Sequence, residues 1–209
     1  MRRPRFDQSA CDDLADCVRE IENQTDAEIV IAVRGRSGSY LHADYLCGAF
    51  VSFATLLFLL FAPFEFQHYW VAIDVVLFFA LGAYVCSRSG AIRRLLTTEE
   101  YRAQAVRTGA AAMFYEAGIA NTDEEMGVLI YLSLLEQRLE LIADRGVLKA
   151  APPLEWNERV YELHRAGRIP QLDTLRKEIR ELGALLGTHL PPTGKNPNEL
   201  PDMPRFDLK

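Results

Sequence analysis

Charged and polar residues are almost missing from two long stretches in the first half of the chain. The first stretch, Tyr45–Ala62, has no charged residue, and the second, Tyr69–Cys86, has the single acid Asp74. Each stretch is about 18 residues long and would form a helix of about 27 Å, close to the thickness of a bilayer's hydrocarbon core. Only a short turn separates them. The pattern predicts a transmembrane hairpin of two helices over residues 45–88.

Two helices buried in a soluble core are the alternative reading of these stretches. A domain of this size could hardly enclose two helices that are apolar on every side. Arginines flank the hairpin on both sides, at Arg34, Arg36, Arg88, Arg93 and Arg94, and its turn contains Glu65 but no Lys or Arg. The positive-inside rule then places both flanking segments in the cytoplasm. We expect an integral membrane protein, located in a bacterial inner membrane, with a cytoplasmic soluble domain.

The segment before the hairpin predicts a helix followed by a strand. Residues 9–23 have an apolar stripe at helical spacing, with Ser9 as the expected N-cap. The following "EIVIAVR" is rich in β-branched residues and apolar on both faces, which is typical of a central strand. The polar "GRSGS" ends this strand.

The segment after the hairpin predicts a helix, two strands and two further helices. The first helix begins at a Thr97/Glu100 capping box and ends at Gly118, with Met113 among its packing residues, together with Tyr101, Ala105 and Ala112. Strands are expected at Val128–Ser133 and Arg138–Ala143, joined as a hairpin. Later helices are expected at residues 154–166, stopped by Gly167, and after Pro170, where Leu172, Leu175, Ile179, Leu182 and Leu186 recur at heptad-like spacing.

This order of elements predicts an α/β fold, a three-layer α/β/α sandwich interrupted by the transmembrane hairpin. Residues 1–44 and 89–190 would form one discontinuous domain, because neither part has a core alone. The tail, residues 191–209, is rich in proline and is expected to lie extended without regular structure.

Composition excludes some classes of function. The chain has 29 acidic and 23 basic residues and a formal net charge of −6, so nothing resembles the basic face of a nucleic-acid-binding protein. Its four cysteines show no metal-binding spacing. The expected partners are therefore the membrane and other membrane proteins, not nucleic acid.

Three stretches resemble the TPM domain, which is also called the TPM phosphatase domain. They are "TDAEIVIAVRGRSGSY", "MFYEAGIANTDEEMGVLIYLSLLEQRLELIADRGV" and "LPPTGKNPNELPD". The matching features include the Thr-x-Ala-Glu entry to the first strand, the Ala-Asp-x-Gly exit from the third and the Asn-Glu-Leu-Pro run in the tail. The resemblance covers nearly the whole soluble part of the chain, with the hairpin inserted after the first strand.

The resemblance implies a compact α/β/α sandwich and, as in some members, a bound divalent cation. Weak acid phosphatase activity is attributed to some plant members, whereas others act in membrane-protein maintenance or as receptor accessories. The commoner layout of the family is an exported domain anchored by a helix at one end. This chain departs from it, because the anchor is internal and the domain is predicted to be cytoplasmic, which puts a periplasmic or lumenal role in doubt.

Recognisable catalytic motifs are missing from the sequence. The four histidines are scattered, and there is no Gly-x-Ser-x-Gly, His-Glu-x-x-His or P-loop motif. The loop after the first strand could offer backbone N–H groups of Gly35, Ser37 and Gly38 to an anion. The alternative for this loop is a flexible exit from the strand toward the membrane helix.

Acidic residues are the better candidates for chemistry. Asp144 ends the third predicted strand, and Asp26 and Glu28 lie at the start of the first. If these two strands are antiparallel, the acids meet at one edge of the sheet, where carboxylates would suit Ca²⁺ or Mg²⁺. Alternatively, Asp144 caps a turn and Asp26 lies in solvent. A further pair, Glu136 and Arg138, is expected to form a surface ion pair.

Two functions are compatible with these patterns. The first is a non-enzymatic interaction or scaffold module at the cytoplasmic face of the membrane. The alternative is a divalent-metal-dependent acid phosphatase of low activity, a hydrolase. No cofactor is required by the sequence itself, and Ca²⁺ or Mg²⁺ is the candidate only if the acidic edge binds a metal.

Overall fold

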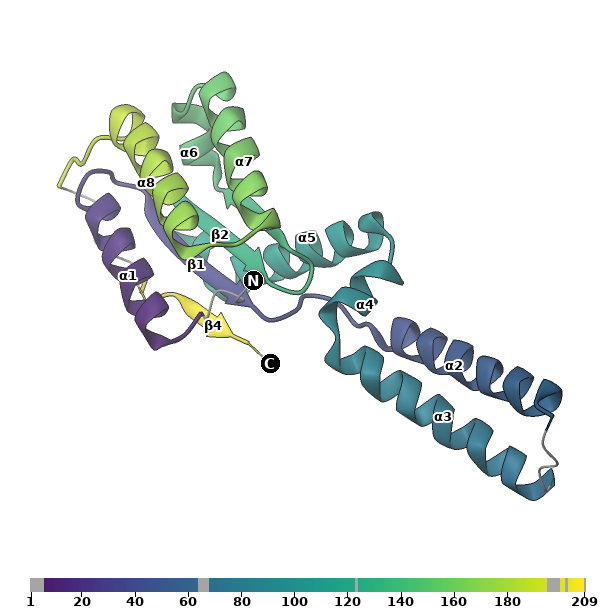
Figure 1. Ribbon diagram of the computed structural model, residues 1–209. Helices are drawn as coiled ribbons and strands as arrows, with labels where there is room; N and C mark the ends of the chain where they lie inside the picture. The colour runs from purple at the N-terminus through teal and green to yellow at the C-terminus, as the bar shows by residue number, and fades with distance from the viewer. Residues whose placement is uncertain (1–5, 64–67, 123, 195–199, 202, 209) are drawn as a thin grey trace. The chain divides into compact units, whose positions relative to one another are not determined.

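The computed structural model describes residues 6–63, 68–122, 124–194, 200–201 and 203–208. The elements follow one another in chain order (Figure 1) as α1 Gln8–Glu22, β1 Glu28–Arg34, α2 Leu41–Phe61, α3 His68–Arg88, α4 Gly90–Leu95, α5 Glu99–Glu116, the 3-10 helix η1 Ile119–Asn121, β2 Gly127–Ser133, β3 Arg138–Ala143, α6 Arg145–Ala150, α7 Pro153–Arg168, α8 Leu172–His189 and β4 Arg205–Asp207. The fold is mixed α/β. Its chain divides into two compact units, residues 1–37 with 103–209 (unit 1) and residues 38–102 (unit 2).

Unit 1 is built on a four-stranded mixed sheet in the order β3-β2-β1-β4. β1 is parallel to both of its neighbours, with Glu28 paired to Gly127 of β2 and Ala32 paired to Arg205 of β4. β2 and β3 form an antiparallel hairpin. The predicted central position of β1 is confirmed, because it lies between two strands and its residues Glu28–Val33 are all buried.

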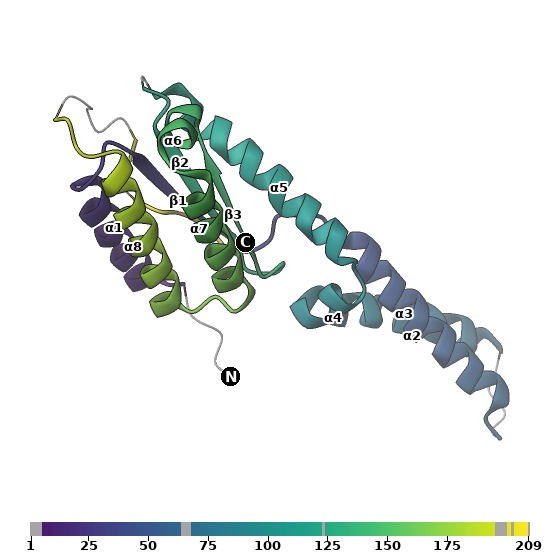
Figure 2. The ribbon, with the colours of Figure 1, turned by 90° about the horizontal axis from the view of Figure 1, so that it is seen from above.

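Both faces of the sheet are covered by helices. Alternate residues of β1 point to opposite faces, so that Ile29 and Ile31 join one apolar core and Val30 and Ala32 join another. The first core contains residues of α1, α7 and α8, and the second contains residues of α5 and η1. Figure 2 shows α1, α7 and α8 on one side of the sheet and α5 on the other. Burial on both faces explains why β1 and β2 are nearly continuous apolar runs.

Unit 2 consists of α2, α3, α4 and the first residues of α5. Helices α2 and α3 pack closely where glycines remove side chains: a Cβ atom on Gly48 would lie 2.7 Å from the Phe79 carbonyl oxygen. The Ser52 hydroxyl donates a hydrogen bond to the Val75 carbonyl at 2.9 Å. Asp44 of α2 holds the Arg93 guanidinium of α4 through two hydrogen bonds of 2.9 and 2.6 Å, and both side chains are buried.

The tail prediction is wrong at its end, because Arg205–Asp207 forms β4. The Phe206 ring contacts Phe6 edge to face at a centroid distance of 6.2 Å, and Asp207 forms an ion pair with Arg34 of β1. Residues 195–199 and 202 of the predicted extended tail lie outside the described residues. The short helices α4 and α6 were not expected, since six residues carry too little periodicity to be recognised.

Several predicted helix ends are corrected. The N-cap of α1 is Asp7 and not Ser9, because the Asp7 carboxylate accepts the Ala10 N–H. For α5, the Thr98 hydroxyl accepts the Tyr101 N–H at 3.2 Å, whereas the Thr97 hydroxyl donates to the Arg93 carbonyl. The expected stop at Gly118 is confirmed by its left-handed backbone, with φ of 77°.

The packing face of α5 is also corrected. Met113 is buried as predicted, but Tyr101 and Ala112 are exposed and Ala105 is only half-buried. The buried side chains of this helix are Val106, Ala110, Met113 and Phe114. The alanine-rich sequence hides this stripe, because alanine occurs on both the buried and the exposed face.

Gly167 does not stop α7, which continues to Arg168. Instead it is buried against β3: a Cβ atom at this position would lie 2.6 Å from the Leu139 backbone nitrogen. The absence of a side chain lets the last turn of α7 approach the strand backbone. Gly167 is therefore a packing residue.

Replacing Gly167 by alanine should lower the stability of unit 1 by about 1–3 kcal/mol, because the added methyl group must push α7 away from β3. Thermal unfolding of the full chain in detergent, followed by the fluorescence of the buried Trp156 in a Trp70→Phe background, measures the loss. The control is Asn157→Ala, an exposed position in the same helix, which should leave the melting temperature unchanged or slightly raised. Equal melting temperatures for both variants would contradict the packing role of Gly167.

Candidate functional site

Four polar side chains meet at the carboxyl ends of the parallel strands β1 and β2. Tyr131 and Ser133 belong to β2, Glu136 lies in the turn that follows it, and Ser37 lies in the loop after β1. In open α/β sheets, ligands generally bind at the carboxyl ends of the strands. This group, which we call the Ser37–Glu136 cluster, is therefore the first candidate for a functional site.

Hydrogen bonds connect the four side chains in a continuous chain. The Ser37 hydroxyl lies 2.9 Å from the Tyr131 hydroxyl and donates to the Ser133 hydroxyl at 2.9 Å. Ser133 in turn donates to one carboxylate oxygen of Glu136, and the Ser37 backbone N–H donates to the other at 2.9 Å. The strand ends position these groups, because the N–H groups of Leu134 and Leu135 donate to the carbonyls of Arg34 and Gly35.

Three of the four side chains, Tyr131, Ser133 and Glu136, are buried, and Ser37 is half-buried. Ser133 is fully buried and Glu136 is only 2% exposed. Gly109 of α5 leaves room for the tyrosine ring, since a Cβ atom there would lie 2.6 Å from the Tyr131 hydroxyl. Burial raises the pKa of Tyr131 above its ordinary value of 10, and this effect exceeds the opposing effect of its hydrogen bond with Ser37. The folded protein therefore favours the neutral phenol.

This geometry favours a structural role for the cluster. A serine beside a carboxylate resembles part of a nucleophilic site, but a nucleophile must be able to reach its substrate. Ser133 is enclosed, and both oxygens of Glu136 accept hydrogen bonds from within the domain. The half-buried Ser37 has its hydroxyl hydrogen-bonded to Tyr131 and Ser133 and has no direct bond from this hydroxyl to the carboxylate. The arrangement fixes the loop that leaves β1 toward unit 2.

The predicted anion-binding loop binds a carboxylate of its own chain. The Ser37 N–H is taken by Glu136, and the Gly35 N–H donates to the Asp207 carbonyl at 2.7 Å. Gly38 also takes part in an interaction within the protein. Binding of an external anion at Gly35, Ser37 and Gly38 stays a prediction, and it would have to displace these internal acceptors.

The three acids predicted to bind metal are placed at the opposite end of the sheet. Both carboxylate oxygens of Asp26 lie 3.0 Å from the Thr193 backbone nitrogen, and Glu28 accepts the Leu200 N–H at 3.3 Å. Asp144 caps α6, and its carboxylate accepts the Arg145 N–H at 2.7 Å.

The structure brings Asp26 and Glu28 together at the start of β1 but separates them from Asp144 by β2. Glu28 pairs with Gly127, whose carbonyl accepts the Asp144 N–H, so Glu28 and Asp144 lie two strand spacings apart, about 10 Å between backbones. Within the described ranges, no group of three His, Cys, Asp or Glu side chains is arranged to hold a metal ion. Calcium takes six to eight oxygen ligands at 2.3–2.6 Å, which this set does not offer. Metal binding by these acids stays a prediction.

Sequence reasoning missed the burial of Glu136. It was expected on the surface, paired with Arg138, but it lies among polar partners supplied by β2 and the loop after β1. One signal was present, namely a serine at the strand end three residues before a glutamate. The loop partner, Ser37, lies about a hundred residues away in the sequence, and no local pattern connects the two.

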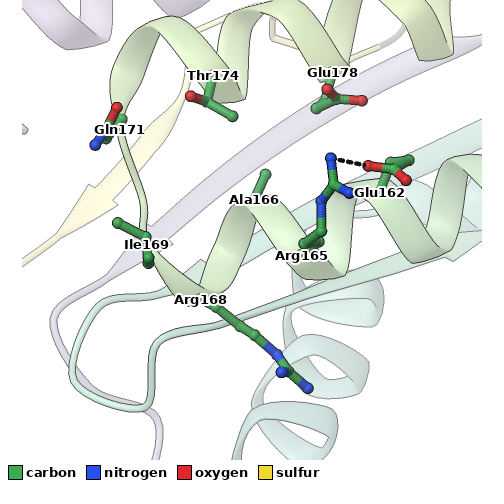
Figure 3. A pocket seen from close by; sticks show the side chains of 8 residues that line it. All are labelled: Glu162, Arg165, Ala166, Arg168, Ile169, Gln171, Thr174 and Glu178. Atoms are coloured by element: carbon green, nitrogen blue, oxygen red, sulfur yellow. Dashed lines mark ion pairs between the residues drawn. The ribbon is translucent and has the colours of Figure 1, made fainter.

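A concave region lies between α7 and α8 and has a volume of about 310 Å³ (Figure 3). Its lining residues are Glu162, Arg165, Ala166, Arg168, Ile169, Gln171, Thr174 and Glu178. Arg165 forms an ion pair of 2.8 Å with Glu162, while Arg168 points away from the groove. The buried Glu178 lies 3.9 Å from Arg159. Acids and bases compensate one another here, which is typical of a helix–helix surface.

Comparison with known proteins gives a likeness in fold. No family model and no curated protein matches the chain. Among solved structures, the NMR structure of BA42 protein from the psychrophilic bacterium Bizionia argentinensis is similar, with a TM-score of 0.58 and 14% sequence identity over 96% of this chain and 95% of that chain. At this identity the likeness concerns the fold alone.

Replacing Glu136 by glutamine should destabilise unit 1 by about 2 kcal/mol, because a donor NH₂ group replaces one of two acceptor oxygens. If the NH₂ group faces the Ser37 N–H, two donors meet; if it faces Ser133, the hydroxyl must turn to accept, which reverses its hydrogen bonds with Glu136 and Ser37. Chemical unfolding of the full chain in detergent, followed by Trp156 fluorescence, measures the change. Glu116→Gln at an exposed position of α5 is the matched control and should have no effect. A loss below about 0.5 kcal/mol for Glu136→Gln, the size of ordinary surface effects, would contradict the role of the cluster.

Tyr131 should make stability depend on pH in the alkaline range. Its raised pKa means that the unfolded chain ionises first, so this stabilising contribution is complete below about pH 10 and is lost as the pH rises through the folded pKa. Tyr131→Phe should be about 1 kcal/mol less stable than the wild type at pH 8, through the lost hydrogen bond. Above pH 10 the two stability curves should converge. Parallel curves between pH 8 and pH 11 would show that Tyr131 does not contribute in this way.

Proposed function

We propose that this chain is an integral membrane protein whose TPM-like α/β domain acts as an interaction or scaffold module at the cytoplasmic face of the membrane. The domain is proposed to be a three-layer α/β/α sandwich. The sheet is the middle layer, α5 is one outer layer, and α1, α7 and α8 form the other outer layer. The similarity to the BA42 structure supports this proposal, because a chain with a similar overall fold has been solved. It carries no information about activity.

The exposure of α2 and α3 is the observation that carries the proposal. Two segments, Leu41–Phe61 and Tyr69–Arg88, are long and apolar enough to span a membrane, and no more than 17% of either apolar window is buried in the protein. A helix that is apolar on every side needs an apolar surrounding. Because unit 2 does not supply one, a bilayer is the surrounding that fits.

Aromatic and basic residues lie where membrane insertion would require them. Tyr45 and Tyr84 are exposed near one end of the two helices, and Tyr69 and Trp70 near the other. Tyrosine and tryptophan favour the two membrane–water interfaces. Arg88 lies over the Tyr84 ring at 5.4 Å, and Arg93 and Arg94 follow in α4, which supports a cytoplasmic location for this end.

The enclosure of polar groups favours a binding module over an enzyme. The Ser37–Glu136 cluster satisfies its own hydrogen bonds, and the acids of the metal hypothesis accept backbone N–H groups. The divalent-metal-dependent phosphatase therefore has no described site that favours it. Membrane anchoring of a domain with helix-covered faces is compatible with partners that are themselves membrane proteins.

Labelling of single cysteines tests this topology in intact cells. In a variant without native cysteines, Pro63→Cys at the exposed end of α2 should react with an impermeant thiol reagent, and the exposed Asn121→Cys should react only after lysis. The reason is that the arginines flank the hairpin and hold its base in the cytoplasm. The Glu65–His68 turn itself lies outside the described residues, apart from the helical backbone of His68.

Two results would contradict the proposal. The reverse labelling pattern would show that the orientation is wrong, and release of the protein by alkaline carbonate would show that it does not span the membrane. A catalytic role is tested separately with a phosphomonoester. Hydrolysis by the purified full chain that depends on Ca²⁺ or Mg²⁺ would favour the phosphatase instead.

A further inference from the structure

The outer side of α3 has a row of side chains at heptad spacing. The row, which we call the α3 seam, consists of Trp70, Asp74, Leu77, Leu81 and Tyr84. Successive members are separated by four and three residues in turn, the spacing at which two helices pack along their whole length. The four apolar and aromatic members are 49–58% exposed.

The seam faces away from α2. The contacts of α3 with α2 run through Val75, Phe79, Gly82 and Cys86. At about 100° per residue, the two rows lie roughly 150° apart around the helix. Helix α2 therefore leaves the seam uncovered, and the described residues of unit 2 include no third helix long and apolar enough to span a membrane and cover it.

Asp74 distinguishes this side from an ordinary lipid-facing surface. It lies five residues after Tyr69, where the span begins, and so about 7.5 Å inside it. Within the described ranges Asp74 takes part in no hydrogen bond or ion pair, and Arg88 is about 21 Å further along the helix. Ionisable groups within membrane spans generally face a partner or a water-filled path. Acyl chains can cover leucine and tryptophan, but they offer nothing to a carboxyl group.

We propose that the α3 seam is the surface at which a second copy of this chain packs in the membrane, side by side and parallel, with the two Asp74 carboxyl groups facing each other. This inference rests on the proposed membrane insertion. Every copy has the same orientation, so a second copy presents a polar group at the depth of Asp74. Two carboxyl groups that share one proton complement each other, because one donates the hydrogen bond that the other accepts.

The position of Asp74 in the α3 seam would also fix how the two α3 helices align. A single polar residue at a core position of a helix pair fixes alignment, because any shift would place the polar group against an apolar side chain. Here the aligned arrangement also sets Trp70 beside Trp70 and Tyr84 beside Tyr84, near the two membrane interfaces. The contact is isologous, as in most dimers of identical chains.

Disulfide cross-linking in native membranes tests the contact. In the full chain without native cysteines, a cysteine at Leu77 or Leu81 should form dimers on mild oxidation. The matched control is Val76→Cys, which is 68% exposed but points about a third of a turn away from the seam. We expect at least tenfold less dimer for the control. Adding Asp74→Ala should reduce the Leu81→Cys dimer by the same order, whereas Asp74→Asn should preserve it, because an amide also donates and accepts.

Equal cross-linking at positions 76 and 77, the absence of dimers at 77 and 81, or unchanged dimers with Asp74→Ala would each overturn the inference. Alkaline carbonate extraction of the same membranes distinguishes a failure of the proposed membrane insertion from a failure of the proposed seam contact. If the wild-type chain is extracted, the proposed membrane insertion fails. If it stays in the membrane without dimers at the seam, only the inference fails. Asp74→Asn guards against misfolding, because loss of dimers in this variant while it remains in the membrane would also overturn the inference.

Discussion

The parallel pairing of β1 with β2 is the contact on which unit 1 depends. It joins segments about a hundred residues apart, because Glu28 pairs with Gly127 and the whole of unit 2 lies between them. Both cores contain side chains from both strands, so neither face of the sheet is complete until the pair has formed. The order β3-β2-β1-β4 makes this pair the centre of the sheet. The remaining strands add to its two edges.

The Ser37–Glu136 cluster extends this dependence beyond the strands. It ties the loop leaving β1 to the turn after β2, using one carboxylate as the acceptor for two donors. A buried charge is tolerable only when its hydrogen bonds are satisfied, which this arrangement achieves. The cluster therefore fixes the point where the chain departs for unit 2. Its hydrogen bonds connect two segments that are distant in the sequence.

Local patterns predicted the elements that carry strong local signals. β1, β2 and β3 were recognised because β-branched and apolar runs are bounded by turn residues, and α8 because Leu175, Ile179, Leu182 and Leu186 follow helical spacing. β4 was missed because it has three residues in a proline-rich tail and exists through its pairing with β1. The placement of Glu136 could not be predicted for the same reason, since its partner Ser37 is remote in sequence. Gly167 could not be interpreted from the sequence, because glycine is typical both of helix ends and of positions where a helix packs closely against another backbone.

The separation of β1 from β2 has a consequence for synthesis of the protein. β1 leaves the ribosome long before β2 has been translated, and during that interval a strand that is buried on both faces in the native state has no neighbour. Long-range pairings form late, and unpaired apolar strands are prone to aggregation in the meantime. Under the proposed membrane insertion, the hairpin would reach the membrane in the same interval and would hold the nascent chain at a surface while β1 has no neighbouring strand. Under the same proposal, folding of unit 1 would be coupled to membrane targeting, and slow delivery to the membrane would harm the fold of this unit as well as its location.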